Sequence, residues 1–536
     1  MTSLAPHPIL SRRSRGVLLH LTSLPGRYGS GSLGDEARHF LDWLVTARQS
    51  LWQILPVTPP GAGDSPYQSV SAFAGSPWLV DLDDLARCGW LEWDDLPWFP
   101  RDHADFARVL PWRMANLRRA WSGFQVRGAD ADRRALAAFA GEHPAWVDAS
   151  CLFMTREGRH GGPWTAGPAA YARRDPVALA RLRQSHAAEI GFWQFVQWRF
   201  HAQWQRLRQQ AHGRGIRLVG DLPIFVAHHS ADVWAHTDLF QLDAAGEPLV
   251  VAGVPPDYFS ETGQRWGNPL YRWDVMAGNG YRWWKRRLAH LLSLVDLVRV
   301  DHFRGFEAYW EIAASEPTAV AGQWRPGPGM AFFESLAQTF GSLPIIAEDL
   351  GIITDAVRDL RRRCGFPGMR IMQFAFGDDA RNPYLPHNFE PATVAYTGTH
   401  DNNTSCGWWD QAGETERHAA LDYLGPMAGA EIHWAMIQSL SQSVANTLIV
   451  PFQDVLGLDG SHRMNTPSQP TGCWAWRFDW SQVDGTPANR LGALTRAHGL
   501  GLIGGEGDAP LGGFGLLGGQ ESAADQRLED EIDRAL

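Results

Sequence analysis

Eight short hydrophobic segments, separated by stretches of helical character, constrain the fold of this chain more than any other feature. Most are unbroken apolar runs rich in β-branched residues, a pattern typical of strands that are covered on both faces. Such strands pair in parallel, with helices packed outside them. The segments are residues 16–21, 51–57, 217–221, 297–301, 344–348, 369–374, 393–396 and 447–450.

Eight such strands alternating with helices predict an α/β protein built on a (β/α)8 TIM barrel. The structural alternative is an open, doubly wound sheet. That fold usually carries a Gly-rich phosphate-binding turn directly after a strand, and none of the eight segments is followed by one. We therefore predict the closed barrel.

The strands are unevenly spaced, and the longest gap predicts a helical addition to the barrel. Residues 86–214 have helical periodicity over much of their length, and the run 187–212 is predicted as an amphipathic helix. Its apolar stripe consists of Phe192, Val196, Phe200, Trp204 and Leu207. We predict a helical insertion subdomain at 86–214, between a first part of the barrel at 1–85 and its remainder at 215–485.

Two further stretches predict irregular structure. Residues 255–271, between the third and fourth segments, are rich in Gly, Pro and Asn and too long for a plain connection, so we expect a functional loop there. Residues 486–536 are Gly-rich and then acidic, and we expect them to form a poorly ordered C-terminal tail.

Charge and cysteine content narrow the classes of function. The 536 residues include 48 Lys and Arg against 58 Asp and Glu, and this net charge of −10 argues against nucleic acid or an anionic membrane as a partner. No apolar stretch is long enough to cross a bilayer, and the N-terminus does not resemble a signal peptide. The five cysteines form no CxxC pair, which argues against a thiolate zinc site or a disulfide framework. We therefore expect a cytoplasmic protein.

Carboxylates stand at the ends of several predicted strands, where a TIM barrel has its active site. Asp221, Asp301 and Glu348 end the third, fourth and fifth strands, and Asp401 closely follows the seventh. One Asp at a strand end often caps the next helix. Several from neighbouring strands would converge on one small patch and raise one another's pKa, which costs stability unless catalysis uses it. We therefore favour a catalytic site.

Paired carboxyl groups, one protonated and one ionised, are what glycoside chemistry requires. Arg299 lies two residues before Asp301, so both side chains are expected on one face of the strand. There the arginine would keep Asp301 ionised, as a nucleophile needs. A structural ion pair inside the barrel is the alternative interpretation.

Two rival chemistries are less well supported. His302, His400, Asp301 and Asp401 could form a metal cluster for hydrolysis, but each His adjoins an Asp, which points to the opposite face of a regular strand. The sequence also has no HExxH motif and no HxH pair on an early strand. Serine-nucleophile catalysis is disfavoured because no GxSxG motif is present.

Seven motifs, in order along the chain, identify a known family. They are SPYQSVSAFAGSP at 65–77, GDLPIFVAHHSADVW at 220–234, VAGVPPDYFSETGQRWGNP at 251–269, VRVDHFRGFEAYW at 298–310, IIAEDLG at 345–351, YTGTHDNNT at 396–404 and RMNTP at 463–467. From about Arg15 to about Arg477 the chain resembles the amylomaltase or disproportionating-enzyme family of 4-α-glucanotransferases, glycoside hydrolase family 77.

The resemblance implies a retaining transferase that moves an α-1,4-glucan segment to the 4-hydroxyl of another glucan or of glucose. It implies Asp301 as the nucleophile that forms a covalent glycosyl-enzyme, Glu348 as the general acid and base, and Asp401 as the residue that binds the donor ring and stabilises the transition state. Malto-oligosaccharides and α-glucans derived from starch or glycogen are the implied partners. No cofactor and no metal are implied, and we expect a monomer or a weak homodimer.

The resemblance also implies a set of substrate-binding residues: Tyr67, Ser65, Asp221, Asp257, Phe259, Gln264, Trp266, Arg299, His400 and Asn465. Tyr67 would stack beneath the donor ring, and Trp266 would belong to a mobile loop over the acceptor side. Core packing is the alternative for both aromatic residues, and a turn before Thr466 and Pro467 is the alternative for Asn465.

Two functions from other classes stay open on the sequence alone. A plain α-glucan hydrolase would share the carboxylates but release one reducing end for each bond cleaved. A glucan-binding protein without catalysis would need no such set of carboxylates.

Overall fold

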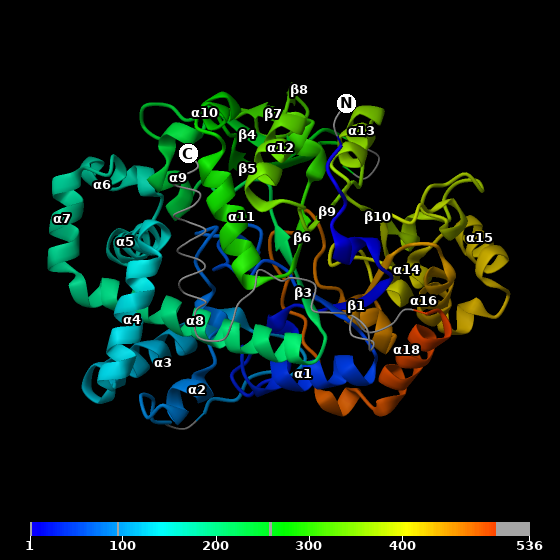
Figure 1. Cartoon of the computed structure of the whole chain (residues 1–536), viewed down its shortest axis with the longest axis horizontal. Coiled ribbons are helices and arrows are strands. Elements are labelled where there is room, and N and C mark those ends of the chain that lie inside the picture. Colours follow the sequence, from blue (N-terminus) through cyan, green and yellow to red (C-terminus); the bar gives the residue numbers. More distant parts are fainter. Residues whose placement is uncertain (1–2, 94–95, 257–259, 500–536) are drawn as a thin grey trace.

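The computed structural model describes residues 3–93, 96–256 and 260–499, and its centre is a closed barrel of eight parallel strands (Figure 1). In order around the barrel they are β1 (Ser14–Leu18), β12 (Thr447–Pro451), β11 (Thr393–Tyr396), β10 (Gly368–Ile371), β9 (Ile345–Ala347), β6 (Leu297–Val300), β3 (Arg217–Leu222) and β2 (Leu51–Gln53). Every predicted segment overlaps one of these strands. The prediction of a TIM barrel is confirmed.

The barrel interior is filled by side chains, including a polar pair that spans it. The Tyr396 hydroxyl in β11 donates to Oε1 of Gln53 in β2 at 2.8 Å, and both residues are buried. Strands β1 and β2 approach each other closely at Gly16. A Cβ on this residue would lie 2.6 Å from the Leu51 carbonyl oxygen. Such packing leaves the ends of the strands as the place where polar side chains can reach a ligand.

Helices surround the barrel and bury their apolar faces against it. The main ones are α1 (Asp35–Thr46), α8 (Ala187–Gly213), α11 (Arg282–Leu294), α12 (Gly329–Phe340), α13 (Asp355–Arg363), α16 (Ile432–Gln442) and α18 (Gly485–Ala497). The whole predicted stripe of α8 is buried, which confirms that amphipathic helix. The indole N–H of Trp204 in this stripe donates to the Leu294 carbonyl at 2.8 Å and so ties α8 to the end of α11.

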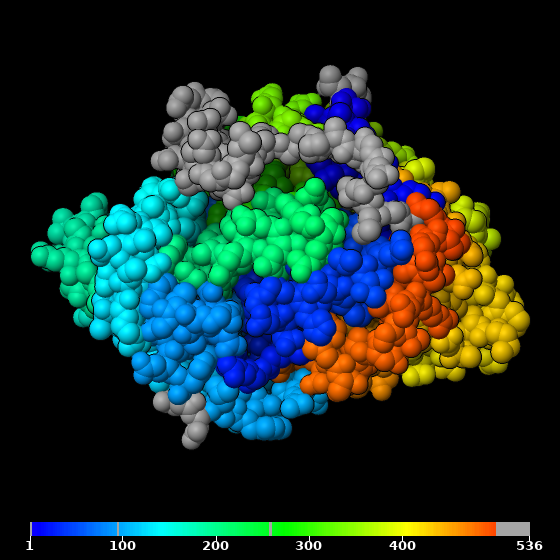
Figure 2. All heavy atoms as spheres, turned by 60° about the horizontal axis from the view of Figure 1, so that its bottom comes forward, coloured from blue at the N-terminus to red at the C-terminus, as the bar shows by residue number. Residues whose placement is uncertain are grey.

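Two groups of helices extend the barrel on opposite sides (Figures 1 and 2). One side holds the insertion helices α3 (Phe106–Arg127), α4 (Asp130–Glu142), α5 (Pro144–His160), α6 (Ala169–Ala172) and α7 (Pro176–Ser185). The other side holds α14 (Ser405–Gln411) and α15 (Glu414–Leu424), beside α16. Shorter helices are α2 (Leu82–Arg87), α9 (Ala231–Ala235), α10 (Trp273–Gly278) and α17 (Phe452–Leu456). The division of the chain into subdomains stays a prediction.

A small antiparallel sheet near the barrel was not expected. It contains, in spatial order, β5 (Gln264–Pro269), β4 (Val250–Val254), β7 (Ala308–Ala313) and β8 (Gly322–Pro326). Part of the predicted loop at 255–271 is therefore strand β5. Its sequence, QRWGNP, has no alternation of apolar and polar residues. Only Asn268 and Pro269 of the strand are buried, and the strand is ordered by its pairing with β4.

The C-terminal helix also departs from the expectation. The first part of the predicted tail forms α18, which is capped by the Asp484 carboxylate accepting from the Thr486 N–H at 2.7 Å. Ala488 and Leu491 bury its inner face, and the helix packs against α1 and α16. Residues 500–536 of the predicted tail lie outside the described residues. Among the helices that are described, none is both long and apolar enough to cross a membrane.

Trp204→Ala should strongly destabilise the fold. The change removes a side chain that is 1% exposed together with its hydrogen bond to Leu294, and we expect a cost of about 3–5 kcal/mol. Thermal unfolding measures it as a lower midpoint. Val126→Ala, at a position 80% exposed, is the control and should change stability by less than about 0.5 kcal/mol. Equal midpoints for the two variants would contradict the role of α8 in joining the barrel.

Candidate active site

One buried arginine joins carboxylates at the ends of two neighbouring strands. Arg299 of β6 places Nη1 2.9 and 2.8 Å from the two carboxylate oxygens of Asp221 in β3, and 3.0 Å from Oδ1 of Asp301. Burial alone would lower the pKa of Arg299, but the carboxylates of Asp221 and Asp301 outweigh it and hold that pKa well above its usual range. The guanidinium is therefore a permanent positive charge at the centre of the site.

A chain of hydrogen bonds extends this site toward β11. The Tyr67 hydroxyl donates to Oδ2 of Asp221 at 2.7 Å and lies 2.9 Å from Nε2 of His400. That nitrogen is 3.4 Å from Oδ2 of Asp401, whose Oδ1 accepts from Nδ2 of Asn465 at 2.6 Å. Seven predicted site residues are thus connected by hydrogen bonds and ion pairs. They are Tyr67, Asp221, Arg299, Asp301, His400, Asp401 and Asn465.

Glu348 is tied to Asp301 through the backbone. Glu348 directly follows β9, and its Oε2 and Oε1 accept from the backbone N–H groups of His302 at 2.7 Å and Leu350 at 3.0 Å. His302 has a φ of 51°, a left-handed conformation that costs a non-Gly residue energy. This turn directs the His302 N–H at Glu348, so the chain that carries Asp301 also orients the second carboxyl group.

The pKa values of both carboxyl groups are raised. For Glu348 the cause is burial, which the charge of Arg299 and the two backbone N–H groups only partly oppose. Burial and the negative charges of Asp221, Glu348 and Asp401 raise the pKa of Asp301 to about 8, against the opposing charge of Arg299. The expected ion pair is present, but Arg299 is shared with Asp221 and does not by itself keep Asp301 ionised in the free site.

Trp266 and Gln264, expected on a mobile loop, lie in β5. The Trp266 indole N–H donates to Oε1 of Gln264 at 3.1 Å, and its ring is edge-on to the His302 ring at 4.9 Å. Strand β5 therefore forms a wall beside the turn that follows Asp301. Asp257 and Phe259 lie outside the described residues. Ser65 supports the site indirectly, since its Oγ accepts from the Tyr67 N–H at 3.3 Å.

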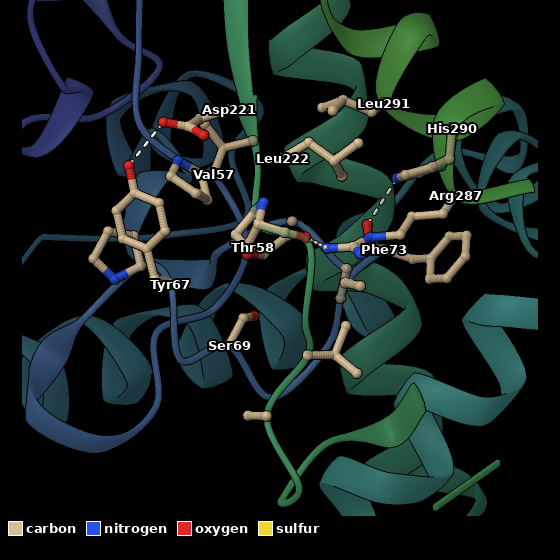
Figure 3. Close-up of a pocket in the computed structure, with 18 of the residues that line it drawn as sticks. Val57, Thr58, Tyr67, Ser69, Phe73, Asp221, Leu222, Arg287, His290 and Leu291 are labelled. Carbon is tan, nitrogen blue, oxygen red and sulfur yellow. Dashed lines mark hydrogen bonds between the residues drawn. The ribbon is translucent and has the colours of Figure 1, made fainter. Parts of the chain in front are cut away.

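A cavity lies behind the Tyr67–Asp221 hydrogen bond, between the strand ends and α11 (Figure 3). The cationic and imidazole groups on its far wall are engaged with backbone. Arg287 Nη2 donates to the Pro223 carbonyl at 2.7 Å, and His290 Nε2 lies 2.8 Å from the Phe73 carbonyl. Most other lining residues are apolar, so this cavity separates the site from the helical layer and brings no further catalytic group to it.

Two residues of the site, Trp474 and Arg463, were not singled out from the sequence, and a third, His302, was considered only as a candidate metal ligand. Trp474 is buried with its ring centroid 5.8 Å from Tyr67 and 6.0 Å from His400. Arg463 Nη2 donates to the Asp401 carbonyl at 2.9 Å, and His302 positions Glu348 as described above. Arg463 and His302 lie within two of the family motifs, and those motifs could have drawn attention to them. Trp474 lies in none of the motifs.

The rival metal cluster is not supported by the arrangement of donors. His400 Nε2 is hydrogen-bonded to Tyr67, and the His302 ring packs against Trp266. Across residues 3–93, 96–256 and 260–499, no three His, Cys, Asp or Glu side chains are grouped so that they could hold one metal ion.

Comparison with known proteins assigns the chain to a family. The family model for 4-alpha-glucanotransferase, glycoside hydrolase family 77, matches residues 19–482. The chain belongs to the 4-alpha-glucanotransferase family. The 4-alpha-glucanotransferase of Thermus thermophilus is 48% identical over 494 residues, which cover 90% of this chain and 98% of the relative. The Synechocystis 4-alpha-glucanotransferase is 43% identical over 92% of this chain and 99% of its own.

Solved structures agree with this assignment. An amylomaltase from Streptococcus agalactiae in complex with acarbose matches with a TM-score of 0.89 and 37% identity, over 91% of this chain and all of that one. An amylomaltase from Corynebacterium glutamicum, at 16% identity and a TM-score of 0.71, supports the fold alone. The resemblance seen in the sequence is confirmed, and the chain is an enzyme of the 4-alpha-glucanotransferase family.

Asp301→Asn should stabilise this enzyme at high pH. A carboxyl group whose pKa is raised from about 3.9 in the unfolded chain to about 8 in the fold destabilises the wild type as pH rises through that window. The variant should therefore melt about 2 °C or more above the wild type at pH 8, with the difference shrinking toward pH 4. Asp410→Asn, at an exposed position, is the control and should show no such trend. A difference that grows toward pH 4 would mean that Arg299 lowers the pKa of Asp301.

Proposed function

We propose that this enzyme transfers an α-1,4-glucan segment from one malto-oligosaccharide or starch chain to the 4-hydroxyl of another glucan or of glucose. The observation that carries the proposal is the single network around Arg299, which connects Asp301 with Asp401 and lies beside Glu348 in a member of this family. The activity by which the relatives are named, and the acarbose in complex with the streptococcal amylomaltase, support the same substrate class.

In the first step Glu348 protonates the glycosidic oxygen while Asp301 attacks the anomeric carbon, and the leaving glucan departs. The raised pKa of Glu348 favours the protonated form that this step needs. Arg299 lies 3.0 Å from Asp301 and favours its ionised form, and a proton shared within the coupled pair resides on Glu348 in the active state. The product is a covalent glycosyl-aspartate.

In the second step Glu348 accepts the proton of the acceptor 4-hydroxyl, and the resulting oxygen displaces Asp301 from the anomeric carbon. Two inversions give net retention. Asp401, whose side chain is 44% exposed, binds hydroxyl groups of the donor ring, and Asn465 orients it from the other side. Hydrogen bonds that strengthen as the oxocarbenium-like transition state forms would supply part of the rate enhancement.

Transfer exceeds hydrolysis only if a bound sugar reaches the intermediate before water does. Trp266 and Gln264 of β5 stand beside the turn after Asp301, and we propose that they, with Asp257 and Phe259, bind the acceptor and exclude water. Tyr67 is held in place by Asp221 and by the turn at Ser65, which fits a fixed wall for the donor ring.

Incubation with pure maltotriose tests the proposed reaction. Each transfer breaks one glycosidic bond and makes another, so we expect a ladder of longer glucans plus glucose at a constant total of reducing ends. Chromatography of the products and a reducing-end assay measure the two quantities separately. A rising total without longer products would mean a hydrolase, and unchanged maltotriose with an intact fold would favour a glucan-binding protein.

Glu348→Gln tests the acid and base role. With maltotriose, loss of the general acid should lower the rate about 10²–10⁴-fold. With α-maltotriosyl fluoride, whose leaving group needs no proton, the first step should recover most of that loss and can be followed by fluoride release. Glu414→Gln, at an exposed position, is the matched control and should keep both activities. Equal losses on both donors would remove Glu348 from the acid role.

A further inference from the structure

Two buried histidines that follow different barrel strands line one small cavity beneath the active site. His20 follows β1 and His400 follows β11, and they are 8% and 6% exposed. Ser23, Gln453 and Trp476 also line it with polar groups, and the Trp476 indole N–H is buried without a partner among the described residues. The cavity therefore connects His400, a member of the site network, to His20, a residue outside the chain of hydrogen bonds and ion pairs described above.

The hydrogen bonds of His400 determine which ring nitrogen carries the proton. Tyr67 has one hydroxyl proton and donates it to Asp221 Oδ2 at 2.7 Å. His400 Nε2, 2.9 Å from the same hydroxyl oxygen, must then be the donor. Asp401, 3.4 Å from Nε2, is a second acceptor and favours the same tautomer. Since neutral imidazole has one N–H, Nδ1 of His400 is an acceptor.

Nδ1 of His400 has no donor among the described protein atoms. It is buried, and so is Nδ1 of His20, which likewise has no partner there. Burial lowers the pKa of both rings, and the nearby His400 lowers the pKa of His20 further, so both stay neutral at ordinary pH. A buried acceptor without a donor is costly, and ordered water commonly satisfies such groups.

The cavity has the size for one such molecule. The space open to the centre of a water-sized sphere is about 20 Å³, and roughly 10–15 Å³ is enough for one water. We propose that one buried water donates to Nδ1 of His400 and makes a second hydrogen bond with Nδ1 of His20. His20 is then a positioning residue that fixes the tautomer of His400. The functional part of this inference rests on the proposed function.

This water-mediated contact between His20 and His400 would set the geometry of the residues around the donor sugar. With Nε2 protonated, His400 donates to Tyr67, and Tyr67 in turn donates to Asp221, the partner of Arg299. If the proton moved to Nδ1, His400 Nε2 and Asp221 Oδ2 would compete for the single hydroxyl proton of Tyr67, and the bond to Asp221 would be lost or weakened. His20 would thus act on the carboxylate network from three contacts away.

A joint X-ray and neutron crystal structure of the full chain tests the water directly. We expect one water within hydrogen-bond distance of both Nδ1 atoms and a deuteron on Nε2 of His400. An empty cavity, or a deuteron on Nδ1 of His400, would overturn the inference. The neutron structure does not depend on activity. The water and the tautomer can therefore be absent while the maltotriose reaction succeeds, or present while that reaction fails.

Kinetics with three variants test the positioning role. His20→Leu removes the partner of the water and should lower kcat on maltotriose roughly tenfold, the size expected for one lost hydrogen bond in a network. His20→Asn keeps a polar atom near the position of Nδ1 and should recover most of that loss. His201→Leu, at another buried histidine with an unpartnered ring nitrogen, packed among aromatic rings of the insertion, controls for the loss of packing.

Thermal midpoints of all three variants separate folding from positioning. At matched stability, a loss of kcat confined to His20→Leu supports the inference. Equal losses in His20→Leu and His201→Leu, or no recovery in His20→Asn when it is folded, would overturn it. Should His20→Leu fail to fold, the neutron structure of the wild type still tests the inference, because an empty cavity or a deuteron on Nδ1 of His400 would overturn it.

Discussion

The shared guanidinium of Arg299 is the interaction on which the arrangement of the active site depends. Asp221 and Asp301 arrive from neighbouring strands, and both lie within 3.0 Å of its Nη1. Without that cation two carboxylates would face each other in a largely dry barrel mouth, where an uncompensated buried charge costs several kcal/mol. The cation allows the two carboxylates to lie close together, but it does not cancel their repulsion fully, as the raised pKa of Asp301 shows.

The barrel fixes the positions of these carboxyl groups relative to one another. Parallel strands end at one edge, so Asp221, Asp301 and Glu348 need no long loops to meet. The left-handed turn at His302 then fixes Glu348 through a backbone N–H, a donor that does not depend on the rotamer of a side chain. Because Trp266 packs against the same turn, the β5 wall and the two carboxyl groups are held by one short segment. A glycosidase-type pair of carboxyl groups needs this kind of fixed spacing.

The sequence predicted the barrel well because its strands are buried on both faces and therefore read as continuous apolar runs. It missed β5, whose half-buried face and Gly-Asn-Pro ending have no such periodicity. It also missed α18, because a Gly-rich stretch follows the helix closely and two Gly residues lie within it. Among the described site residues, those at strand ends could be predicted from position. Trp474 and His20 could not, since their places depend on packing between segments far apart in the chain.

The pKa values and hydrogen bonds of the site residues show which of them carry an electrostatic cost. Burial disfavours the ionised forms of Asp301 and Glu348 and raises their pKa values, whereas hydrogen bonds join Tyr67 to His400 and Asn465 to Asp401. In the proposed mechanism, the groups with raised pKa values are the ones that change protonation or form a bond. The hydrogen-bonded groups would hold the sugar, and a rigid network of fixed donors and acceptors suits that role. In that mechanism the second set would influence how long the donor stays in place while an acceptor replaces water.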